Sequence, residues 1–395
     1  MSQEKAYWLA WSHVRGIGPT LLKRIEQKFG SLSQAWQLPV AELGKVEGFG
    51  GAIISKVQEE RPKINPAQLL EKHLQDNPQF WTPADPDYPR LLLEIPSPPP
   101  VLYYRGQVDL QENLGKVPAI AIVGTRYPTA YAKSWTRKIA KTLAEQGFII
   151  VSGMAAGIDA EAHWSCLKAN RRTIAVLGTG VDRIYPHSNQ KLYQQLEQEG
   201  LLLSEYPAGA KPERGNFPAR NRIIAGLSRA VLIMEAPQKS GALITARFAN
   251  DFCRDVYVLP GTLDNQQAIG CLDLLNRGAH VILSETHLLE MLQTIPMLDP
   301  STGDRSFPSS KKSQLTLDFS DSKLNITSPP PQKRDFSHLE PELAQIMSIM
   351  RSESLSLDAI AEKTGLDTGK LLASLSQLEI MGLISQLPGM RYVAT

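Results

Sequence analysis

Short apolar runs alternate with helical patterns through the middle of the chain, from about residue 117 to 292. Buried parallel strands read as continuous apolar runs, and each crossover between them needs a helix. In the first crossover, Trp135, Ile139 and Leu143 fall on one helical face. The pattern therefore predicts an α/β fold with a central Rossmann-like parallel sheet, whose expected strands are Ala119–Val123, Phe148–Val151, Thr173–Leu177, Leu201–Ser204, Ala230–Met234 and Val256–Leu259.

The first 65 residues predict short helices joined by two similar hairpins, Arg15–Pro19 and Val46–Gly50. Each hairpin holds a pair of glycines, which permits a tight turn between helices. The segment resembles a tandem helix-hairpin-helix, or SAM-like, domain, in which such glycines bring backbone N–H groups close to DNA phosphates. A helical bundle whose glycines only turn the chain explains the pattern equally well.

Composition divides the rest of the chain. Residues 66–116 are rich in proline but interleave it with apolar and aromatic residues, which indicates an ordered cover on the central domain. Residues 296–337 are rich in Ser, Pro, Asp and Lys, which is typical of a flexible linker. Three helical patterns and a hairpin then predict a C-terminal winged helix. The predicted domains are thus a helix-hairpin-helix domain at 1–65, an extended Rossmann-like domain at 66–295, the linker at 296–337 and the winged helix at 338–395.

Glycines follow three of the predicted strands at their carboxyl ends, where open parallel sheets bind ligands. The three loops are Gly124-Thr125-Arg126, then Ser152–Gly157, then Gly178–Gly180. Glycine allows the close backbone approach that a phosphate needs, and the helix after each loop offers unpaired N–H groups. Any single loop could merely turn strand into helix. Three at successive strand ends, one of them with Arg126, favour an anion site.

Two later loops extend this hypothesis. Residues 211–222 place several cations around Phe217, including Arg220 and Arg222. Nucleobases stack on aromatic rings for roughly 1 to 3 kcal/mol each, while cations follow the backbone, so Phe217 is the stacking candidate. An equally good interpretation makes Phe217 a core anchor for its loop. After the fifth predicted strand, Lys239 and Ser240 stand where a fourth phosphate contact could form.

Enzymatic interpretations meet missing residues. The first loop lacks the Gly-x-Gly-x-x-Gly pattern of dinucleotide-dependent oxidoreductases, and no Walker A sequence is present. Asp159, Glu161 and His163 lie close together, but no second ligand cluster accompanies them. We expect a capping aspartate, a solvated glutamate and a histidine packed on the sheet. The sequence therefore predicts no catalytic residue, no metal and no cofactor.

Charge and composition add little about partners. The formal net charge is only +2, so bulk electrostatics do not indicate a nucleic-acid ligand. No apolar stretch is long enough to span a bilayer, and the N-terminus lacks a signal-peptide pattern, so we expect a cytoplasmic protein without membrane attachment. Three isolated cysteines, Cys166, Cys253 and Cys271, fit small buried reduced thiols.

An ordered series of motifs resembles the DNA-processing protein A family, also called DprA or Smf. The matching segments, spread over about 140 residues, are Ala121–Arg126, Ser152–His163, Gly178–Pro186, Ser204–Pro207, Asn216–Ile224, Lys239–Arg247 and Val258–Gly261. The resemblance implies single-stranded DNA binding, a homodimer formed through the Rossmann-like domain, and delivery of DNA to the RecA recombinase in natural transformation and homologous recombination.

The site residues that the resemblance and the loops together suggest are the following: Gly124, Thr125, Arg126, Ser152, Gly153, Gly157, His187, Phe217, Arg220, Asn221, Arg222, Lys239 and Ser240. The chain departs from the family at two positions. His187 stands where relatives often carry lysine, which puts one phosphate contact in doubt, and Leu272 stands where asparagine is common.

Two functions of other classes remain as alternatives. Rossmann-like nucleoside-phosphate hydrolases are expected to carry a Pro-Gly-Gly-x-Gly-Thr loop, whereas this chain has Pro237–Gly241 with Gln, Lys and Ser between those two residues. A regulator that binds duplex DNA could use the winged helix. From His338 onward, however, seven acids oppose four cations, a net charge of −3 that disfavours phosphate neutralisation. We expect that domain to contact protein or to stabilise the chain.

Overall fold

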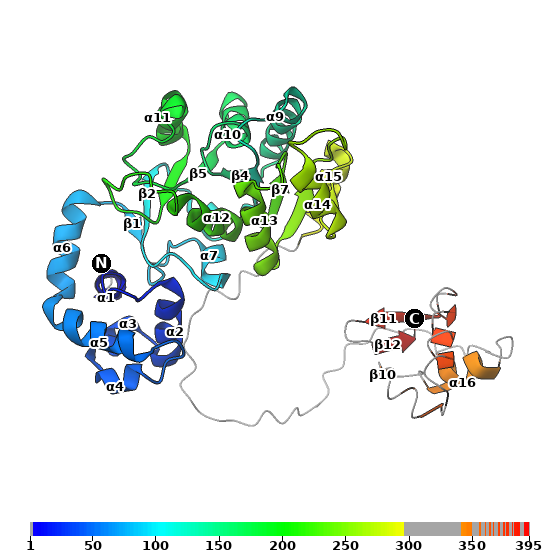
Figure 1. Ribbon diagram of the computed structural model, residues 1–395, viewed down its shortest axis with the longest axis horizontal. Helices are drawn as coiled ribbons and strands as arrows, with labels where there is room; N and C mark the ends of the chain where they lie inside the picture. The colour runs from blue at the N-terminus through cyan, green and yellow to red at the C-terminus, as the bar shows by residue number, and fades with distance from the viewer. Residues whose placement is uncertain are drawn as a thin grey trace, which may run out of the picture. The chain divides into compact units, whose positions relative to one another are not determined.

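The computed structural model describes residues 3–295 and, with gaps, residues 341–394. The chain divides into two compact units, Met1–Ser310 and Lys311–Thr395 (Figure 1). The predicted linker at 296–337 lies outside the described residues.

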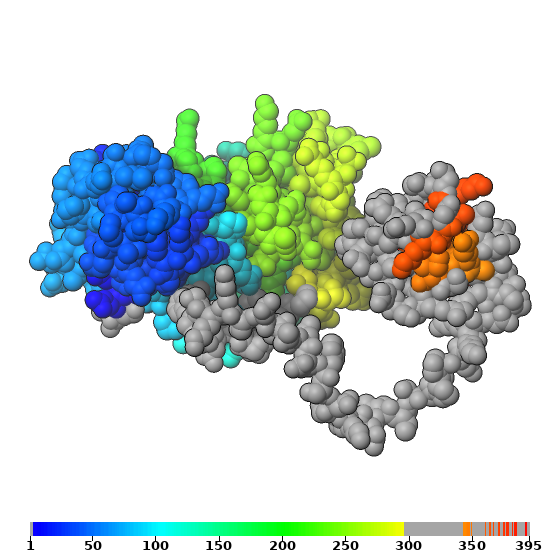
Figure 2. Space-filling view, turned by 90° about the horizontal axis from the view of Figure 1, so that it is seen from below, coloured from blue at the N-terminus to red at the C-terminus, as the bar shows by residue number. Residues whose placement is uncertain are grey.

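The N-terminal part of the first unit is helical. Trp8, Trp11, Leu22 and Ile25 are almost fully buried in its core, and the Trp11 and Trp36 rings pack edge to face at 4.9 Å. The elements are α1 (Gln3–Ser12), α2 (Pro19–Phe29), α3 (Leu32–Gln37), α4 (Val40–Leu43), α5 (Gly51–Glu60), η1 (Arg61–Lys63) and α6 (Pro66–Asp76). In Figure 2 these helices, coloured in shades of blue, form one continuous body.

The two hairpins form tight turns, as the sequence predicts, and they are related by a repeat of 32 residues. Gly16 and Gly48 both adopt positive φ, of 88° and 92°, where a side chain would be strained. Two residues later, Gly18 and Gly50 are the N-caps of α2 and α5. Gly16 faces Ile53 and Lys56 of α5, while Gly48 faces Leu21 and Arg24 of α2. Each turn therefore packs on the helix that follows the other turn, at equivalent positions.

One nine-stranded sheet dominates the first unit, in the order β1-β2-β6-β5-β4-β3-β7-β8-β9. The six predicted strands are confirmed, with ends that shift by no more than one residue: β3 (Ala119–Val123), β4 (Ile149–Ser152), β5 (Thr173–Leu177), β6 (Leu201–Ser204), β7 (Ala230–Ile233) and β8 (Asp255–Val258). Each of these six strands is parallel to its neighbours of this set in the sheet. Sequence reasoning missed three strands, β1 (Phe80–Trp81), β2 (Leu102–Gly106) and β9 (His280–Val281).

Helices cover both faces of the sheet because its side chains alternate between two cores. Ile120 and Ile122 face α9 (Ala130–Glu145), α10 (Ile158–Lys168) and α15 (Glu285–Gln293), with α11 (Gln190–Glu199) on the same side. Ala121 and Val123 face α7 (Arg90–Glu94), α12 (Asn216–Leu227), α13 (Gly241–Asp251) and α14 (Ile269–Asn276). Figure 1 shows the two helical layers above and below the sheet.

The proline-rich segment is ordered, and it extends the sheet. Its strands β1 and β2 pair antiparallel and join the sheet through β6, and α8 (Leu110–Asn113) follows them. Phe80 and Tyr103 pack on Leu9 of α1, and the Lys5 ammonium donates a hydrogen bond of 2.6 Å to the Phe80 carbonyl. This segment therefore fixes the helical N-terminal part against the sheet edge.

In the second unit the described elements are α16 (Pro341–Ile349), β10 (Leu355–Ser356), β11 (Ile384–Leu387) and β12 (Arg391–Ala394). The strands form an antiparallel sheet in the order β10-β12-β11. Leu343 and Ile346 of α16 are buried with Ile384 and Tyr392 of the sheet. A helix packed on a small sheet that ends in a hairpin is typical of the predicted winged helix.

Two of the three thiols lie where expected. Cys166 and Cys271 are buried in the cores on opposite faces of the sheet, but Cys253 is exposed, so the expectation of a buried thiol is wrong there. Cys253 lies in the turn between α13 and β8, in a left-handed conformation with φ of 56°. Within the part of the chain that the structure describes, no helix has the length and apolarity needed to cross a bilayer.

Candidate functional site

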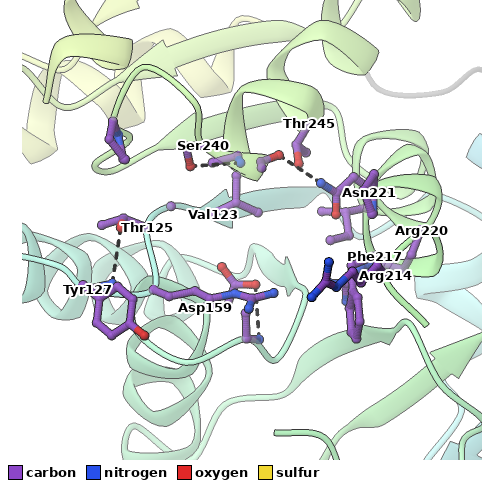
Figure 3. Close-up of a pocket in the computed structure, with 18 of the residues that line it drawn as sticks. Val123, Thr125, Tyr127, Asp159, Arg214, Phe217, Arg220, Asn221, Ser240 and Thr245 are labelled. Carbon is purple, nitrogen blue, oxygen red and sulfur yellow. Dashed lines mark hydrogen bonds between the residues drawn. The ribbon is translucent and has the colours of Figure 1, made fainter. Parts of the chain in front are cut away.

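The glycine loops meet around a cavity of about 530 Å³ at the carboxyl ends of β3, β4 and β7 (Figure 3). The loop after β3 contributes Gly124–Tyr127, α12 contributes Phe217 and Asn221, and the start of α13 contributes Ser240 and Gly241. A second cavity of about 200 Å³ adjoins it, lined by the loops after β4 and β5. The predicted convergence of the strand-end loops is confirmed.

Glycine is required in these loops because they interlock. A side chain at Gly124 would place its Cβ 2.6 Å from the Ile158 Cγ1 atom and 2.9 Å from the Glu235 carbonyl oxygen. Gly157 has φ of +85°, and a Cβ there would lie 2.4 Å from the Thr125 carbonyl oxygen. That same oxygen accepts a hydrogen bond of 3.2 Å from the Ile158 N–H. The loop after β3 therefore rests directly on the start of α10.

Arg126, Phe217 and Tyr185 form a group at the mouth of both cavities. The Arg126 guanidinium carbon lies 6.0 Å from the centroid of the Phe217 ring, and the Phe217 and Tyr185 rings lie 5.1 Å apart at 34°. Arg126 is exposed, and no carboxylate within the described residues lies within 4.0 Å of its guanidinium. An exposed cation thus lies beside the Phe217 ring, which itself packs on Tyr185, an arrangement suited to a phosphate next to a flat ring.

Two buried charged residues, Arg220 and Asp159, support the floor of the cavities. Arg220 is only 5% exposed, and its Nη1 atom donates hydrogen bonds to the carbonyls of Gly153, at 2.7 Å, and of Val176. The Asp159 carboxylate accepts from the N–H groups of Gly153, at 3.1 Å, and of Ala155, at 3.4 Å. Burial raises the pKa of Asp159, and Arg220 opposes that rise. Burial lowers the pKa of Arg220 to about 10.

Asp159 and Arg220 therefore hold the loop after β4 in place. Asp159 lies in the first turn of α10, whose N-cap is Gly157, so the expected capping aspartate instead ties the adjoining loop. Arg220 lines both cavities, and its Nη1 atom already donates to two backbone carbonyls.

Several predicted site residues line the cavities and others do not. Gly124, Thr125, Arg126, Asn221 and Ser240 line the larger cavity with Phe217 and Arg220, and Gly153 lines the smaller one. Asn221 donates a hydrogen bond of 3.0 Å to the Gly241 carbonyl, and Ser240 caps α13 through the Ala242 N–H. These hydrogen bonds tie the middle of α12 to the start of α13 and cap that start.

Arg222 faces away from both cavities. Its guanidinium forms an ion pair with Glu205 and donates a hydrogen bond of 3.1 Å to the Ser97 carbonyl. Residues two apart on a helix do not share a face, so Arg220 and Arg222 of α12 cannot both face the cavities. The prediction that Arg222 lines the pocket is not supported by this placement.

Four further predicted residues lie outside the larger cavity. Ser152 is buried, and its hydroxyl donates a hydrogen bond of 2.6 Å to the Ile122 carbonyl, so it joins β4 to β3. His187 begins the short helix η2 (His187–Asn189), and neither cavity includes it in its lining. Lys239 is exposed next to Ser240, and Gly157 lines a third cavity on the other side of the loop after β3.

Sequence reasoning missed Arg214, Tyr185 and Thr245, which line the larger cavity. Arg214 was visible as one cation in the run 211–222, and its spacing of three residues from Phe217 at the start of α12 was the available signal. Tyr185 is brought beside Phe217 only by the fold, because Tyr185 lies in the loop after β5 and Phe217 lies in α12, which follows β6.

The remaining titratable residues near the site serve structure. The Nδ1 atom of buried His163 lies 2.8 Å from the Thr173 hydroxyl, which itself donates to the Ile150 carbonyl, so Nδ1 must carry the proton. Burial lowers the pKa of His163 to about 3. His163 is packed on the sheet as predicted, whereas Glu161 is held at 2.7 Å by Arg137 rather than simply solvated. Within the described residues, no group of three His, Cys, Asp or Glu could hold a metal ion.

Comparison with known families gives two matches along the chain. Residues 79–293 match the model of a family described as DNA recombination-mediator protein A. Residues 328–390 match the model of the DprA winged helix domain.

Individual relatives cover most of the sequence. Protein Smf of Synechocystis sp. is 56% identical over 400 residues, which span 99% of this chain and 99% of that protein. The DNA processing protein DprA of Bacillus subtilis is 37% identical over 61% of this chain and 80% of its own length. The X-ray structure of DNA processing protein A from Streptococcus pneumoniae aligns with a TM-score of 0.63 and 34% identity, covering 73% of this chain and 98% of that one.

Proposed function

The chain belongs to the DNA recombination-mediator protein A family, whose members carry the names DprA and Smf, and on that premise we propose that its strand-end cavities bind single-stranded DNA. The observation that carries the proposal is the group formed by Arg126, Phe217 and Tyr185. It places one free cation and two aromatic faces beside loops that only glycine can form.

DNA phosphates would contact the exposed cations around these cavities. Arg126 and Arg214 line the larger cavity, and exposed Lys239 lies next to Ser240 at its border. Backbone N–H groups in glycine loops and at helix N-termini add donors that need no side chain. Such contacts are independent of base sequence, so we expect affinity to depend strongly on salt and weakly on sequence.

Bases would stack on Phe217 and Tyr185. The Phe217 ring lies over Gly178, where a Cβ would be 2.7 Å from the Phe217 Cδ1 atom. The ring is half-buried, so it both anchors its loop and borders the two cavities. These two roles, which the sequence left as alternatives, are compatible in one residue.

The shape of the site favours single strands over duplex. The smaller cavity lies between Tyr185, Phe217 and the loops after β4 and β5. A base can enter it only if it is unstacked and unpaired, which costs free energy in a duplex and little in a single strand. The site at the carboxyl ends of the β-strands therefore favours single-stranded over duplex DNA.

We further propose that the protein acts without catalysis, as a homodimer in the cytoplasm, and passes the bound strand to a RecA-type recombinase in DNA recombination and natural transformation. A nucleoside-phosphate hydrolase is disfavoured because Asp159 and His163 are buried and held by backbone and Thr173 partners. A duplex-binding regulator is disfavoured by the acidic balance after His338.

The experiment is a salt titration of the purified protein on single-stranded and duplex DNA of equal length. We expect binding that prefers the single strand at every salt concentration. Equal or stronger binding to the duplex would overturn the proposal. In the same preparation, the rate at which recombinase filaments start on the bound strand tests the handover, and an unchanged rate would contradict it.

A further inference from the structure

A third cavity lies on the other side of the loop after β3. It measures about 460 Å³ and runs along the starts of α9 and α10, with Pro128, Lys133, Gly157, Glu161 and Trp164 in its lining. We call it the α9–α10 groove. Arg126 and Tyr127 line this groove and also both cavities of the proposed DNA site. Arg126 and Tyr127 therefore form a ridge between the groove and the two cavities, and they line all three.

Tyr127 stands on that ridge with little support from the protein. Its side chain is 83% exposed, the second most exposed of the large apolar and aromatic residues in the described chain after Leu263 at 87%. The backbone below it is fixed, because its N–H donates a hydrogen bond of 3.2 Å to the Thr125 hydroxyl. A ring that is held at its base and exposed on its faces is suited to stacking against a flat ligand rather than to packing in a core.

The α9–α10 groove has more cationic than acidic side chains in its lining, and its one acid is already paired. Glu161 is its one acidic lining residue, and Arg137 binds both carboxylate oxygens at 2.7 and 3.0 Å. No ion pair joins Lys133 to a carboxylate within the part of the chain that the structure describes. The lining of the groove thus includes two cations, Arg126 in the loop after β3 and Lys133 in α9, together with the half-buried Trp164 of α10.

We propose that a bound single strand of DNA continues over Tyr127 and into the α9–α10 groove, with a base stacked on the Tyr127 ring and a phosphate on Lys133. The inference rests on the proposed function, because it extends the same site. Gly157 matters to this path because it lines the groove, and because a Cβ there would collide with the backbone of Thr125 and Arg126, so that only glycine lets the loop of Arg126 and Tyr127 lie against the start of α10. The strand-end cavities would hold a short segment, and the groove would add affinity only for strands long enough to cross the ridge.

The test compares oligothymidines of about 6 and about 16 nucleotides, lengths within the range that single-strand sites of known folds occupy. Tyr127→Ala should weaken the long strand about tenfold and the short strand several-fold less, because only the long strand crosses the Tyr127 ring and loses the stacking contact. Tyr127→Phe, which keeps the ring, should bind both lengths as the wild type does. Lys133→Ala should lower the salt slope on the long strand by about 0.7 and leave the slope on the short strand unchanged.

Two control substitutions come from the same helix. Tyr131 is 47% exposed and its hydroxyl lies 3.3 Å from the Pro260 carbonyl, while Lys138 pairs with Glu285 at 2.6 Å; neither lines any of the three cavities. Tyr131→Ala and Lys138→Ala should change neither affinity by more than twofold.

Three outcomes would overturn the inference while leaving the proposed function intact. They are equal affinity of the wild type for both lengths, an equal loss on both lengths in Tyr127→Ala, and no loss in either variant. A wild-type protein that binds neither strand would overturn the proposed function itself.

Discussion

The Nη1 atom of Arg220 donates a hydrogen bond of 2.7 Å to the carbonyl oxygen of Gly153, and this contact joins α12 to the loop after β4. A Cβ at Gly153 would lie 2.7 Å from the Arg220 Nη2 atom and 2.7 Å from an Asp159 carboxylate oxygen, so the pair encloses the glycine tightly. Arg220 thus supports the loops that form the site, whereas the side chain of Arg126 is exposed and available to a ligand.

Replacement of Arg220 should therefore cost stability. Arg220→Met would leave two buried carbonyls without their donor and Asp159 without its opposing charge, so we expect the free energy of unfolding to fall by about 3 to 5 kcal/mol. Chemical denaturation measures this. Arg183→Met, in which an exposed side chain pairs with Asp182 at 3.9 Å, should lose less than about 0.5 kcal/mol. An Arg220→Met protein as stable as the wild type would show that the buried pair is not a support.

Replacement of Arg126 should affect binding instead. Arg126→Ala should weaken single-strand binding and lower the salt slope by about 0.7, the value for one phosphate contact on a single strand. Its exposed side chain supports no core, so the unfolding transition should not move. Arg24→Ala, in the helical N-terminal part, is the matched control and should have the smaller effect on affinity. Unchanged affinity and slope in Arg126→Ala would remove Arg126 from the site.

Gly157 should tolerate no side chain. Gly157→Ala forces an L-residue to φ of +85° and places its Cβ 2.4 Å from a backbone oxygen, so we expect a loss of at least about 2 kcal/mol in stability. Gly215→Ala is the control, because Gly215 has φ of −69° and no atom lies within 4 Å of the added Cβ. Thermal denaturation should separate the two variants. Equal melting temperatures would contradict the interlocked loops.

His163 should make stability depend on pH. Its pKa is lowered by burial from 6.5 to about 3, so the unfolded chain binds a proton between these values and the folded chain does not. Stability from this residue is fully present above pH 6.5 and is lost as the pH falls toward 3, by up to about 1.4 kcal/mol per pH unit.

The measurement is the difference in unfolding free energy between the wild type and His163→Leu across pH 4 to 7. The raised pKa of Asp159 makes its own contribution to stability increase as the pH falls, opposite to that of His163. Because Asp159 is present in both proteins, its contribution cancels in the difference. A difference that stays constant with pH would show that His163 titrates normally.

Removal of the second unit should spare DNA binding. A chain that ends near Pro300 keeps every residue that lines the three cavities, so its single-strand affinity should stay within threefold of the full chain, under about 1 kcal/mol. Binding of fluorescent oligonucleotides measures the ratio. Loss of binding, or tight duplex binding by the isolated winged helix at physiological salt, would make that domain a DNA reader.

The sequence determined the six strands from β3 to β8 and the position of their loops, because buried parallel strands and glycine turns leave local signals. It also determined the two N-terminal turns, since positive φ at Gly16 and Gly48 requires glycine wherever the helices pack. The strands towards the two ends of the sheet left no such signal. β1 and β9 have two residues each, and β2, which lies between β1 and β6, directly follows a proline run.

Only the tertiary structure decided which of the predicted cations are free. Arg126, Arg220 and Arg222 look alike in a sequence, but their surroundings differ in the fold. Arg220 donates to the carbonyls of Gly153 and Val176, and Arg222 binds Glu205 and the Ser97 carbonyl. The Arg126 guanidinium has no carboxylate within ion-pair distance in the described chain. Likewise the fold brings Tyr185, after β5, against Phe217 of α12, and it places Tyr127 in the lining of all three cavities. Local pattern sets what each segment becomes, whereas burial and pairing depend on neighbours that only the assembled sheet supplies.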